Sequence, residues 1–600
     1  MVSKGHIDQI SSAPKILGDR LAVARGDKPA ELVIRNARWL DVFSGTWQTG
    51  DVAIFDGLIV GVSDSYEAKS VIDAKGAALV PGFIDSHVHI ESSMMTPRQF
   101  AKAVLPRGTT AVIWDPHEIA NVKGTAGIQW ALDSSEGLPM DFFVMVPSCV
   151  PSTSGDLNLE TSGAALTAKD IAQFAGHPRV LGLAEMMNWP GLVHGDKDVV
   201  DKLLVFQDKR RDGHCPGLSG KLLNAYGVAG IHSCHESTTK AEASEKLTKG
   251  IHVLIREGSC AKDADELLPL VNSWTSATVG FCSDDRNPLD IEEAGHLDCI
   301  VNKALIMGLD PVAVFRAASF APARMYGLGD RGAVAPGYRA DLVLLRPVAG
   351  ERDFSKGVSV EKVLRGGAEA STLLSCMFPV ERVNLDKGKA NLQIKGTIKA
   401  SDFAIPARGK ETAKARVIGV RPRQIVTDHL ELDVACSDGK ISLSPTPDIN
   451  KISVIERHHA TGQMATALVK GFSLVNGAIA TSINHDCHNV IVTGSSDELM
   501  ARAVDELRKI DGGIVVVSSA GKIASMALPI GGLMTSEEPE HVAESLRHLK
   551  QLARDIGCTL EEPFLQLSFL ALPVIPTLKI TDRGLVDGTT FKVVAVEMEK

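Results

Sequence analysis

Several features are missing from this sequence of 600 residues, and each absence excludes a class of protein. No apolar run reaches the roughly 18 residues that a membrane-spanning helix needs, and the polar N-terminal extension, residues 1–30, lacks the apolar core of a secretory signal. The net charge is −10 without a long basic run, which disfavours binding to a nucleic-acid polymer or to an anionic membrane surface. We therefore expect a cytoplasmic protein whose partner is a small molecule.

Short metal-binding and nucleotide-binding motifs are also missing. The ten cysteines never occur in CxxC spacing, which excludes zinc-ribbon and thioredoxin-like sites and fits a chain with reduced thiols. His117-Glu118 lacks the second histidine of the HExxH motif, and His89-Ile90-Glu91 lacks the PCxxC partner of cytidine-type deaminases. No GxSxG or Walker motif is present.

Between residues 81 and 330, apolar segments alternate with helical patterns, and each apolar segment ends in a polar cluster. The polar ends fall near residues 85, 115, 147, 185, 214, 235, 257 and 284, about 21 to 38 residues apart, which is the length of a βα unit. Eight such units predict a catalytic (β/α)8 TIM-like barrel of the α/β class. Lys209–Gly213 is a poor strand by propensity. An open doubly wound sheet is the alternative, but no glycine-rich phosphate fingerprint follows any strand.

Short-strand patterns flank the barrel on both sides. We expect residues 31–80 and 331–400 to join into one small β-sandwich domain that the barrel interrupts. Within its first half, the Asp56-Gly57 pair between two apolar runs predicts a hairpin. Residues 405–600 carry enough apolar pattern for a separate C-terminal α+β domain.

Candidate metal ligands occur at the predicted strand ends. His87 and His89 form an HxH pair at the first end, where both imidazoles can face one cation, although chance alone gives roughly half such a pair in a chain with this many histidines. Glu185 ends the fourth strand, where the alternative is a carboxylate that stabilises a helix N-terminus. His214 and His235 end the fifth and sixth strands, and each alone is more often a structural residue.

Asp284 and Asp285 close the eighth strand, where an aspartate is also an ordinary helix N-cap. All these ends meet at the carboxyl face of a barrel, where catalytic residues of this fold lie. Together, six side chains suit two divalent cations bridged by a carboxylate and a hydroxide: His87, His89, Glu185, His214, His235 and Asp284. Imidazole and carboxylate ligands fit manganese or iron, with zinc as the alternative.

Pro81–His89 and the flanking β domain resemble the amidohydrolase superfamily, and the chain resembles its bacterial-type adenine deaminases over nearly the whole length. The matching stretches are Asp115–Val122, Pro147–Pro151, Leu183–Asn188, Asp212–Gly217, His235-Glu236, Arg256–Gly258, Asp284–Arg286, His485–Asn489 and Leu528–Leu533. The DPHEIANV stretch at 115–122 is far more specific than the HxH pair. The resemblance implies a metallohydrolase barrel that serves purine salvage or adenine catabolism.

The resemblance also implies roles. His87 and His89 should bind the first metal ion and His214 and His235 the second, with Glu185 bridging and Asp284 on the first. A metal-bridging hydroxide would deaminate adenine to hypoxanthine and ammonia, with Asp284 as the base and Glu118 as the acid that protonates ring N1. The expected substrate-binding residues are Asp115, His117, Ser148, His485 and Asp486.

Three positions depart from related enzymes. The carbamylated lysine of many relatives has no counterpart at the fourth strand end, Gly217 stands where mononuclear deaminases place a glutamate, and Cys234 stands where we expect an aspartate before His235. Two alternative functions stay open at this stage: a cyclic-amide hydrolase that uses the same metal ions, and a non-catalytic scaffold. A homodimer is the default expectation for a soluble enzyme.

His485, Asp486, His488 and Asn489 form a polar cluster just before the apolar strand Val490–Thr493. This cluster is either a solvated turn with a capping asparagine or a loop that covers the barrel mouth, excludes water and positions the purine. A further metal site is disfavoured there, because no carboxylate bridge or additional histidine follows at ligand spacing.

Overall fold

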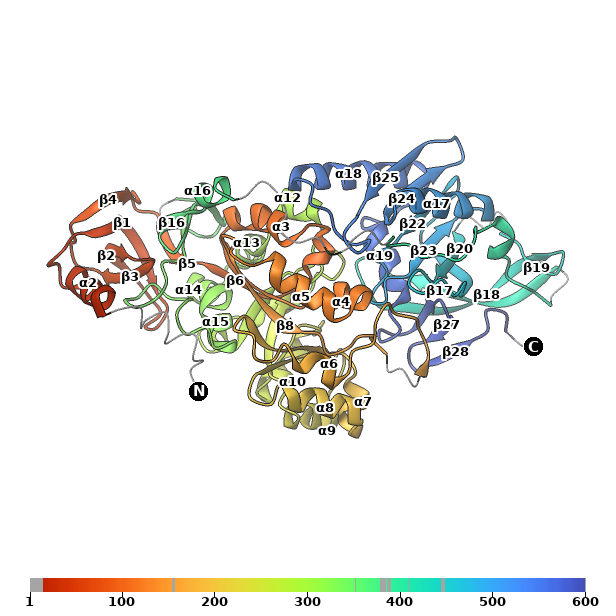
Figure 1. The fold of residues 1–600 in the computed structure, drawn as a ribbon, viewed down its shortest axis with the longest axis horizontal. Coiled ribbons are helices and arrows are strands. Elements are labelled where there is room, and N and C mark those ends of the chain that lie inside the picture. Colours follow the sequence, from red (N-terminus) through yellow and green to blue (C-terminus); the bar gives the residue numbers. More distant parts are fainter. Residues whose placement is uncertain are drawn as a thin grey trace.

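The structure is a computed structural model that describes residues 14–153, 157–350, 352–377, 385, 390–408, 411–443 and 448–598. Three parts follow one another along the longest axis in Figure 1: a sheet built on the N-terminal strands, a central barrel and a C-terminal part. Of the expected N-terminal extension, residues 1–13 lie outside the described residues. Within the described ranges, no helix is both long enough and apolar enough to cross a membrane.

The barrel is an eight-stranded sheet in which each strand is parallel to the next. Its strands are β6 (Phe83–Val88), β7 (Thr109–Trp114), β8 (Asp141–Val146), β9 (Val180–Met186), β10 (Arg210–Gly213), β11 (Ser233–Cys234), β12 (His252–Arg256) and β13 (Val279–Cys282). The helices between and after them are α3 (Pro97–Val104), α4 (His117–Lys123), α5 (Thr125–Ser134), α6 (Ala168–Ala172), α7 (Trp189–His194), α8 (Lys197–Val205), α9 (Gly220–Val228), α10 (Lys240–Thr248), α11 (Ala264–Leu267), α12 (Pro288–Ala294), α13 (Leu297–Ile306), α14 (Pro311–Phe315) and α15 (Ala321–Met325). The predicted α/β barrel is confirmed.

The barrel closes between its last strand and its first. The amide of Asp284 donates to the carbonyl of His87 at 3.1 Å, and the amide of His89 donates to the carbonyl of Asp284 at 3.3 Å. Strand β10, in the region of poor propensity, is only four residues long. Residues at the carboxyl ends of these strands, among them His89, Glu185 and Asp284, line one pocket with Phe569 and other residues of the C-terminal part, which therefore faces the predicted catalytic end of the barrel.

A second sheet contains strands from both flanks of the barrel. Its strands are β1 (Ala30–Asp41), β2 (Thr46–Phe55), β3 (Leu58–Val62), β4 (Ala68–Asp73), β5 (Ala78–Pro81), β14 (Leu342–Pro347), β15 (Val358–Arg365) and β16 (Ala368–Glu369). The antiparallel pairing of β5 with β14 joins the two segments. The predicted hairpin is confirmed, since Asp56 and Gly57 connect β2 to β3 with φ angles of 50° and 73°. Helix α2 (Pro14–Ala24) packs against this sheet through the buried side chain of Val23.

The C-terminal part is built on a nine-stranded sheet. In sheet order its strands are β19 (Lys440–Ile441), β18 (Thr427–Ser437), β17 (Thr412–Val420), β21 (Met464–Lys470), β20 (Ile449–Ile455), β23 (Val490–Gly494), β22 (Gly477–Thr481), β24 (Gly513–Ser518) and β25 (Ile523–Ala527). Two helices, α17 (Asp497–Lys509) and α18 (Pro539–Asp555), pack on it, and α19 (Pro563–Ser568) precedes a small sheet of β26 (Leu578–Thr581), β27 (Gly584–Asp587) and β28 (Lys592–Val594).

The packing moves the expected domain boundary at residues 400–405 toward the N-terminus. Leu392, Ile394 and Phe403 belong to the apolar cluster between α17 and the C-terminal sheet. These side chains cover α17 and not the sheet that β14–β16 extend, so residues 390–403 pack with the C-terminal part. The apolar pattern of this short segment did not reveal which of two sheets it would cover.

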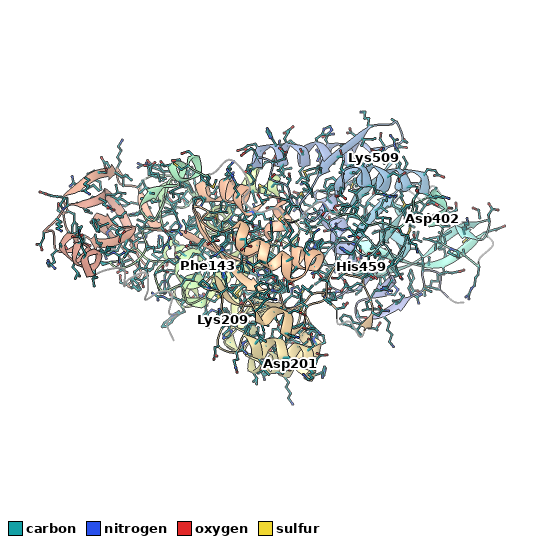
Figure 2. The ribbon with its side chains drawn as sticks, in the orientation of Figure 1. Phe143, Asp201, Lys209, Asp402, His459 and Lys509 are labelled. Atoms are coloured by element: carbon teal, nitrogen blue, oxygen red, sulfur yellow. The ribbon has the colours of Figure 1, made fainter. Side chains whose placement is uncertain are left out.

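Hydrogen bonds hold the C-terminal part on the barrel. Gln99 Nε2 donates to the carbonyl of Ser536 at 2.8 Å, and Asn287 Nδ2 donates to Glu562 Oε2 at 3.0 Å. His459, labelled in Figure 2 at the boundary between the two parts, has its Nε2 3.0 Å from the carbonyl of Ser162. The mouth of the barrel is therefore a junction between two parts of the chain.

Candidate metal centre and active site

The first group of donors lies where the barrel closes. His87 is in β6 and His89 directly follows it, and their Nε2 atoms are 3.0 Å apart. Asp284 Oδ1 lies 3.5 Å from His87 Nε2 and 3.2 Å from His89 Nε2. Glu185 Oε1, from the end of β9, lies 3.8 Å and 3.3 Å from the same two nitrogens.

The second group shares the same glutamate. Glu185 Oε2 lies 2.6 Å from His214 Nδ1 and 3.2 Å from His235 Nε2. Glu236 Oε1 lies 3.4 Å from His235 Nε2. The two oxygens of Glu185 therefore face two separate groups of imidazoles, which is the geometry of a bridging carboxylate.

This donor set fits divalent cations. Bonds of about 2.1 Å in a tetrahedral site place neighbouring donors about 3.4 Å apart, close to the spacings within both groups. His89 Nδ1 lies 3.1 Å from the carbonyl of Asp115, an acceptor, so this nitrogen carries the proton and the Nε2 lone pair points into the group. The side chains are buried, with His214 the most exposed at 6 %. Buried carboxylates and imidazoles at such density are typical of metal sites.

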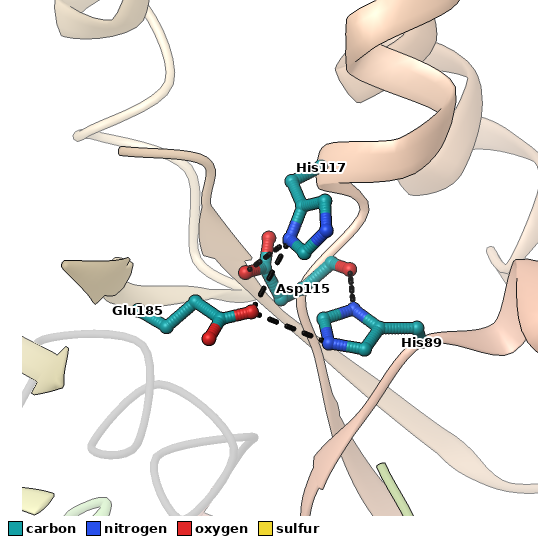
Figure 3. A group of neighbouring side chains, drawn as sticks. All are labelled: His89, Asp115, His117 and Glu185. Atoms are coloured by element: carbon teal, nitrogen blue, oxygen red, sulfur yellow. Dashed lines mark hydrogen bonds and ion pairs between the residues drawn. The ribbon is translucent and has the colours of Figure 1, made fainter. Parts of the chain in front are cut away.

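His117 and Asp115 adjoin the first group, as Figure 3 shows. His117 Nδ1 lies 3.1 Å from Asp115 Oδ2 and 3.4 Å from Glu185 Oε1. Asp115 thus holds two neighbouring residues, His89 through its carbonyl and His117 through its carboxylate. The structure brings both of these predicted site residues to the metal-ligand groups.

The donors form one side of a pocket at the mouth of the barrel. Its polar lining includes His117, Arg256, Asp285, His485 and Asp486, and its apolar lining includes Ile425, Phe569 and Leu572. The rings of Phe569 and His485 are stacked, with centroids 4.4 Å apart and an interplanar angle of 8°. The cavity therefore combines a charged floor with an aromatic and aliphatic wall, a combination suited to a small flat ligand.

Glu118 lies one layer behind this lining. Its Oε1 is 3.1 Å from Ser92 Oγ and 3.4 Å from His485 Nδ1. Burial, together with the charges of Asp285 and Glu91, raises the pKa of Glu118 to about 8. The carboxyl group is consequently protonated at neutral pH.

Ser148 does not line the cavity. Its hydroxyl donates instead to the backbone carbonyl of Glu185 at 2.5 Å, and its side chain is buried between β8 and β9. This arrangement supports the strand end that carries Glu185. Substrate binding by Ser148 stays a prediction, and in this structure its hydroxyl is engaged by the backbone of Glu185.

The sequence reasoning assigned no role to Arg256 and Glu236. Arg256 ends β12 with 2 % exposure, pairs with Glu236, and donates to Asp284 Oδ2 at 3.1 Å. The available signal was its place at the seventh strand end, between those of His235 and Asp284. Cys234, the residue that departs from the expected pattern, accepts from the buried Lys246 Nζ at 3.3 Å.

Charges in the site favour an ionised Glu185. Its burial opposes ionisation, but His214 and His235 outweigh that effect and hold the pKa of Glu185 well below its usual range. Burial also opposes ionisation of Asp284, but hydrogen bonds from His87 and His89, and then the charge of Arg256, hold its pKa well below the usual range. Both carboxylates are therefore available as negatively charged ligands.

A parallel barrel with this donor set at its carboxyl end defines a metal-dependent hydrolase of the amidohydrolase class, and residues 78–370 match the amidohydrolase family. Residues 424–592 match the adenine deaminase C-terminal domain. Adenine deaminase 1 of Rhizobium meliloti (strain 1021) is 46% identical over 95% of this chain and 98% of its own length. The adenine deaminase of Brucella abortus (strain 2308) is also 46% identical, over 95% of both chains. The chain belongs to the adenine deaminase family.

Solved structures are more distant. The crystal structure of an adenine deaminase is 17% identical to this chain, covers 57% of it and 99% of its own length, and superposes with a TM-score of 0.41.

Proposed function

We propose that the protein hydrolyses adenine to hypoxanthine and ammonia. The observation that carries this proposal is the pair of donor groups that share Glu185 in a pocket that also has an aromatic wall. The relatives at 46% identity over 95% of the chain, which are named adenine deaminases, support the choice of substrate.

The proposed cofactors are two divalent cations, manganese or iron, with zinc as the alternative. His87, His89 and Asp284 would hold the first, and His214 and His235 the second, with Glu185 shared. When bound, the cations supply a water molecule of lowered pKa and compensate the negative charge that develops during attack.

Asp284 is the proposed base. Its Oδ1 faces the imidazoles, while its Oδ2 accepts a hydrogen bond from Arg256 at 3.1 Å. That hydrogen bond fixes the carboxylate and keeps it ionised. In this proposal Asp284 would take a proton from the attacking water and return it to the departing amine.

Glu118 is the proposed source of the proton for ring N1. Its raised pKa, about 8, keeps a proton on the carboxyl group at neutral pH. Because His485 lines the cavity and lies 3.4 Å from Glu118, we assign the transfer to the pair and not to Glu118 alone. Asp486 and His117 would orient the purine at the same edge of the cavity.

The test is to incubate the purified protein with adenine and with hydantoin. Release of hypoxanthine and ammonia from adenine supports the proposal. Opening of hydantoin without action on adenine would favour a cyclic-amide hydrolase, and inactivity on both would favour a scaffold. The homodimer and the cytoplasmic location stay predictions.

A further inference from the structure

We propose that Ile425, Phe569 and Leu572 form the surface against which the flat face of the purine packs, and that Lys579 is the positioning residue that holds this surface together. The inference rests on the proposed function, since it assigns the part of that site that binds the ring. It gives the C-terminal part a direct role in substrate binding.

The three apolar side chains lie on the cavity lining that also carries the metal-ligand groups. His485 stacks on one face of Phe569, with centroids 4.4 Å apart and ring planes within 8° of parallel, and this contact fixes the orientation of the phenyl ring in the lining. A purine has two large π-faces, and aromatic and aliphatic side chains bind such faces without needing hydrogen bonds. A ring held against this surface would present its edge to the polar residues of the cavity.

The surface is assembled from two segments that are distant in the sequence. Ile425 lies in the loop between β17 and β18, whereas Phe569 and Leu572 lie just after α19. Neither segment is part of a sheet or a long helix that would fix its position. Something must therefore hold the loop against the turn that follows α19.

Lys579, on β26, makes that connection. Its side chain is completely buried, and its Nζ donates to the carbonyl of Ile425 at 2.7 Å and to the carbonyl of Phe569 at 3.0 Å. One amine thus joins the backbones of two of the three surface residues. Removing it would leave the buried carbonyl of Phe569 and the half-buried carbonyl of Ile425 without these donors, which is costly unless the segments move apart to reach water.

The connection does not depend on the charge of the amine. Burial lowers the pKa of Lys579 to about 7. A neutral amine still carries two N–H groups, as many as the two carbonyls require. The thiol of Cys260 acts on this pKa in the opposite direction to burial, and no ion pair of Lys579 with a carboxylate occurs among the described residues.

The experiment compares Lys579→Met with the wild type. Methionine keeps the length and the apolar stem but removes both donors. We expect the KM for adenine to rise about tenfold with kcat within about twofold, because the reacting groups are untouched while ring binding weakens. The Kd for the product hypoxanthine, measured by calorimetry, should rise by the same factor, and the metal content should not change.

Lys451→Met is the matched control. Lys451, on β20, is another buried lysine of the C-terminal part and is 4 % exposed. It forms an ion pair with Asp497 at 2.7 Å and does not contact the cavity lining. A general loss of stability would appear in both variants, whereas a rise in KM and Kd should appear only in Lys579→Met. Lys579→Gln, which retains an NH2 group, should recover part of the binding.

A folded Lys579→Met variant with KM and Kd within twofold of the wild type would overturn the inference. If that variant does not fold, Phe569→Ala takes its place, and an unchanged Kd for hypoxanthine would overturn the assignment of the surface. A wild-type protein that is inactive on adenine contradicts the proposed function itself, before any variant is compared.

Discussion

Asp486 Oδ1 lies 3.8 Å from Nε2 of His117, so that a residue of the C-terminal part contacts the first helix after β7 at the mouth of the barrel. Both side chains are buried, as are the neighbouring His485, His488 and Asn489. The polar cluster at 485–489 is therefore not a solvated turn. His485 and Asp486 line the same pocket as the candidate metal ligands.

Replacing His485 and Asp486 together with alanine tests the role of this loop. Loss of the contacts with Glu118 and His117 should raise the KM for adenine or lower kcat, because the loop positions both the ring and its proton donor. The metal content should stay unchanged. His459→Ala is the control, since that residue contacts Ser162 at the same boundary and does not line the cavity. Kinetic constants within twofold of the wild type would contradict the role in catalysis.

Glu185→Gln should abolish most of the activity. A neutral amide cannot balance two cations, so we expect elemental analysis to fall from about two divalent ions per chain in the wild type to about one or fewer. The fold should survive, because the barrel core does not depend on this side chain. Glu160→Gln is a matched control: Glu160 is also buried but bonds to Ser152 and Thr153 in another loop. Near-normal turnover and metal content in Glu185→Gln would show that the bridge is elsewhere.

Asp284→Asn should keep part of the metal and lose turnover. The amide oxygen can still act as a ligand, but it cannot accept a proton, and losing such a group costs about 10²–10⁴-fold in kcat. Steady-state kinetics and metal analysis of the same preparation separate the two effects. Asp285→Asn is the comparison, since Asp285 bonds to Ser92 at 2.5 Å and is the other candidate base. A loss below tenfold in Asp284→Asn would move the base to Asp285.

Glu118→Gln tests the acid through the pH profile. The wild type requires the protonated form of a group whose pKa is about 8, so kcat/KM should be full below that pH and fall as the pH rises through it. Glutamine has no titratable proton, so the residual rate of the variant should lack this fall. A fall of equal size and position in both proteins would assign the titration to another group.

The convergence of the six candidate metal ligands could be predicted because it follows from one regularity. The ends of parallel strands meet at one face of a barrel, so Glu185 and His214 converge although they lie on different strands. Strand β10 has a poor strand propensity, but it still places His214 at the same face because it pairs in parallel with β9 and β11. Strand periodicity alone is sufficient to place His87 and His89 together.

The apolar side of the cavity could not be predicted in this way. Ile425, Phe569 and Leu572 look like any core residues in the sequence, and only the docking of one part of the chain on another brings them to the cavity. The role of Lys579 could not be predicted either. Its two partners are backbone carbonyls, which every residue has, so the sequence contains no signal for these hydrogen bonds. The hydrogen bond of Ser148 to the carbonyl of Glu185 could not be predicted either, since the rotamer of a serine depends on the nearest acceptor.

The seam that closes the barrel has a thermodynamic consequence. The residues whose backbones make the last hydrogen bonds of the sheet, His87, His89 and Asp284, are also ligands of the first proposed cation. A cation that binds these residues only when β6 and β13 are hydrogen-bonded stabilises the closed barrel by mass action. Occupancy of the cation site and the cooperativity of unfolding are therefore linked. The amides of His89 and Asp284 would then exchange with deuterium more slowly in the loaded protein than after chelation, whereas those of β16, at the far edge of the other sheet, would not respond.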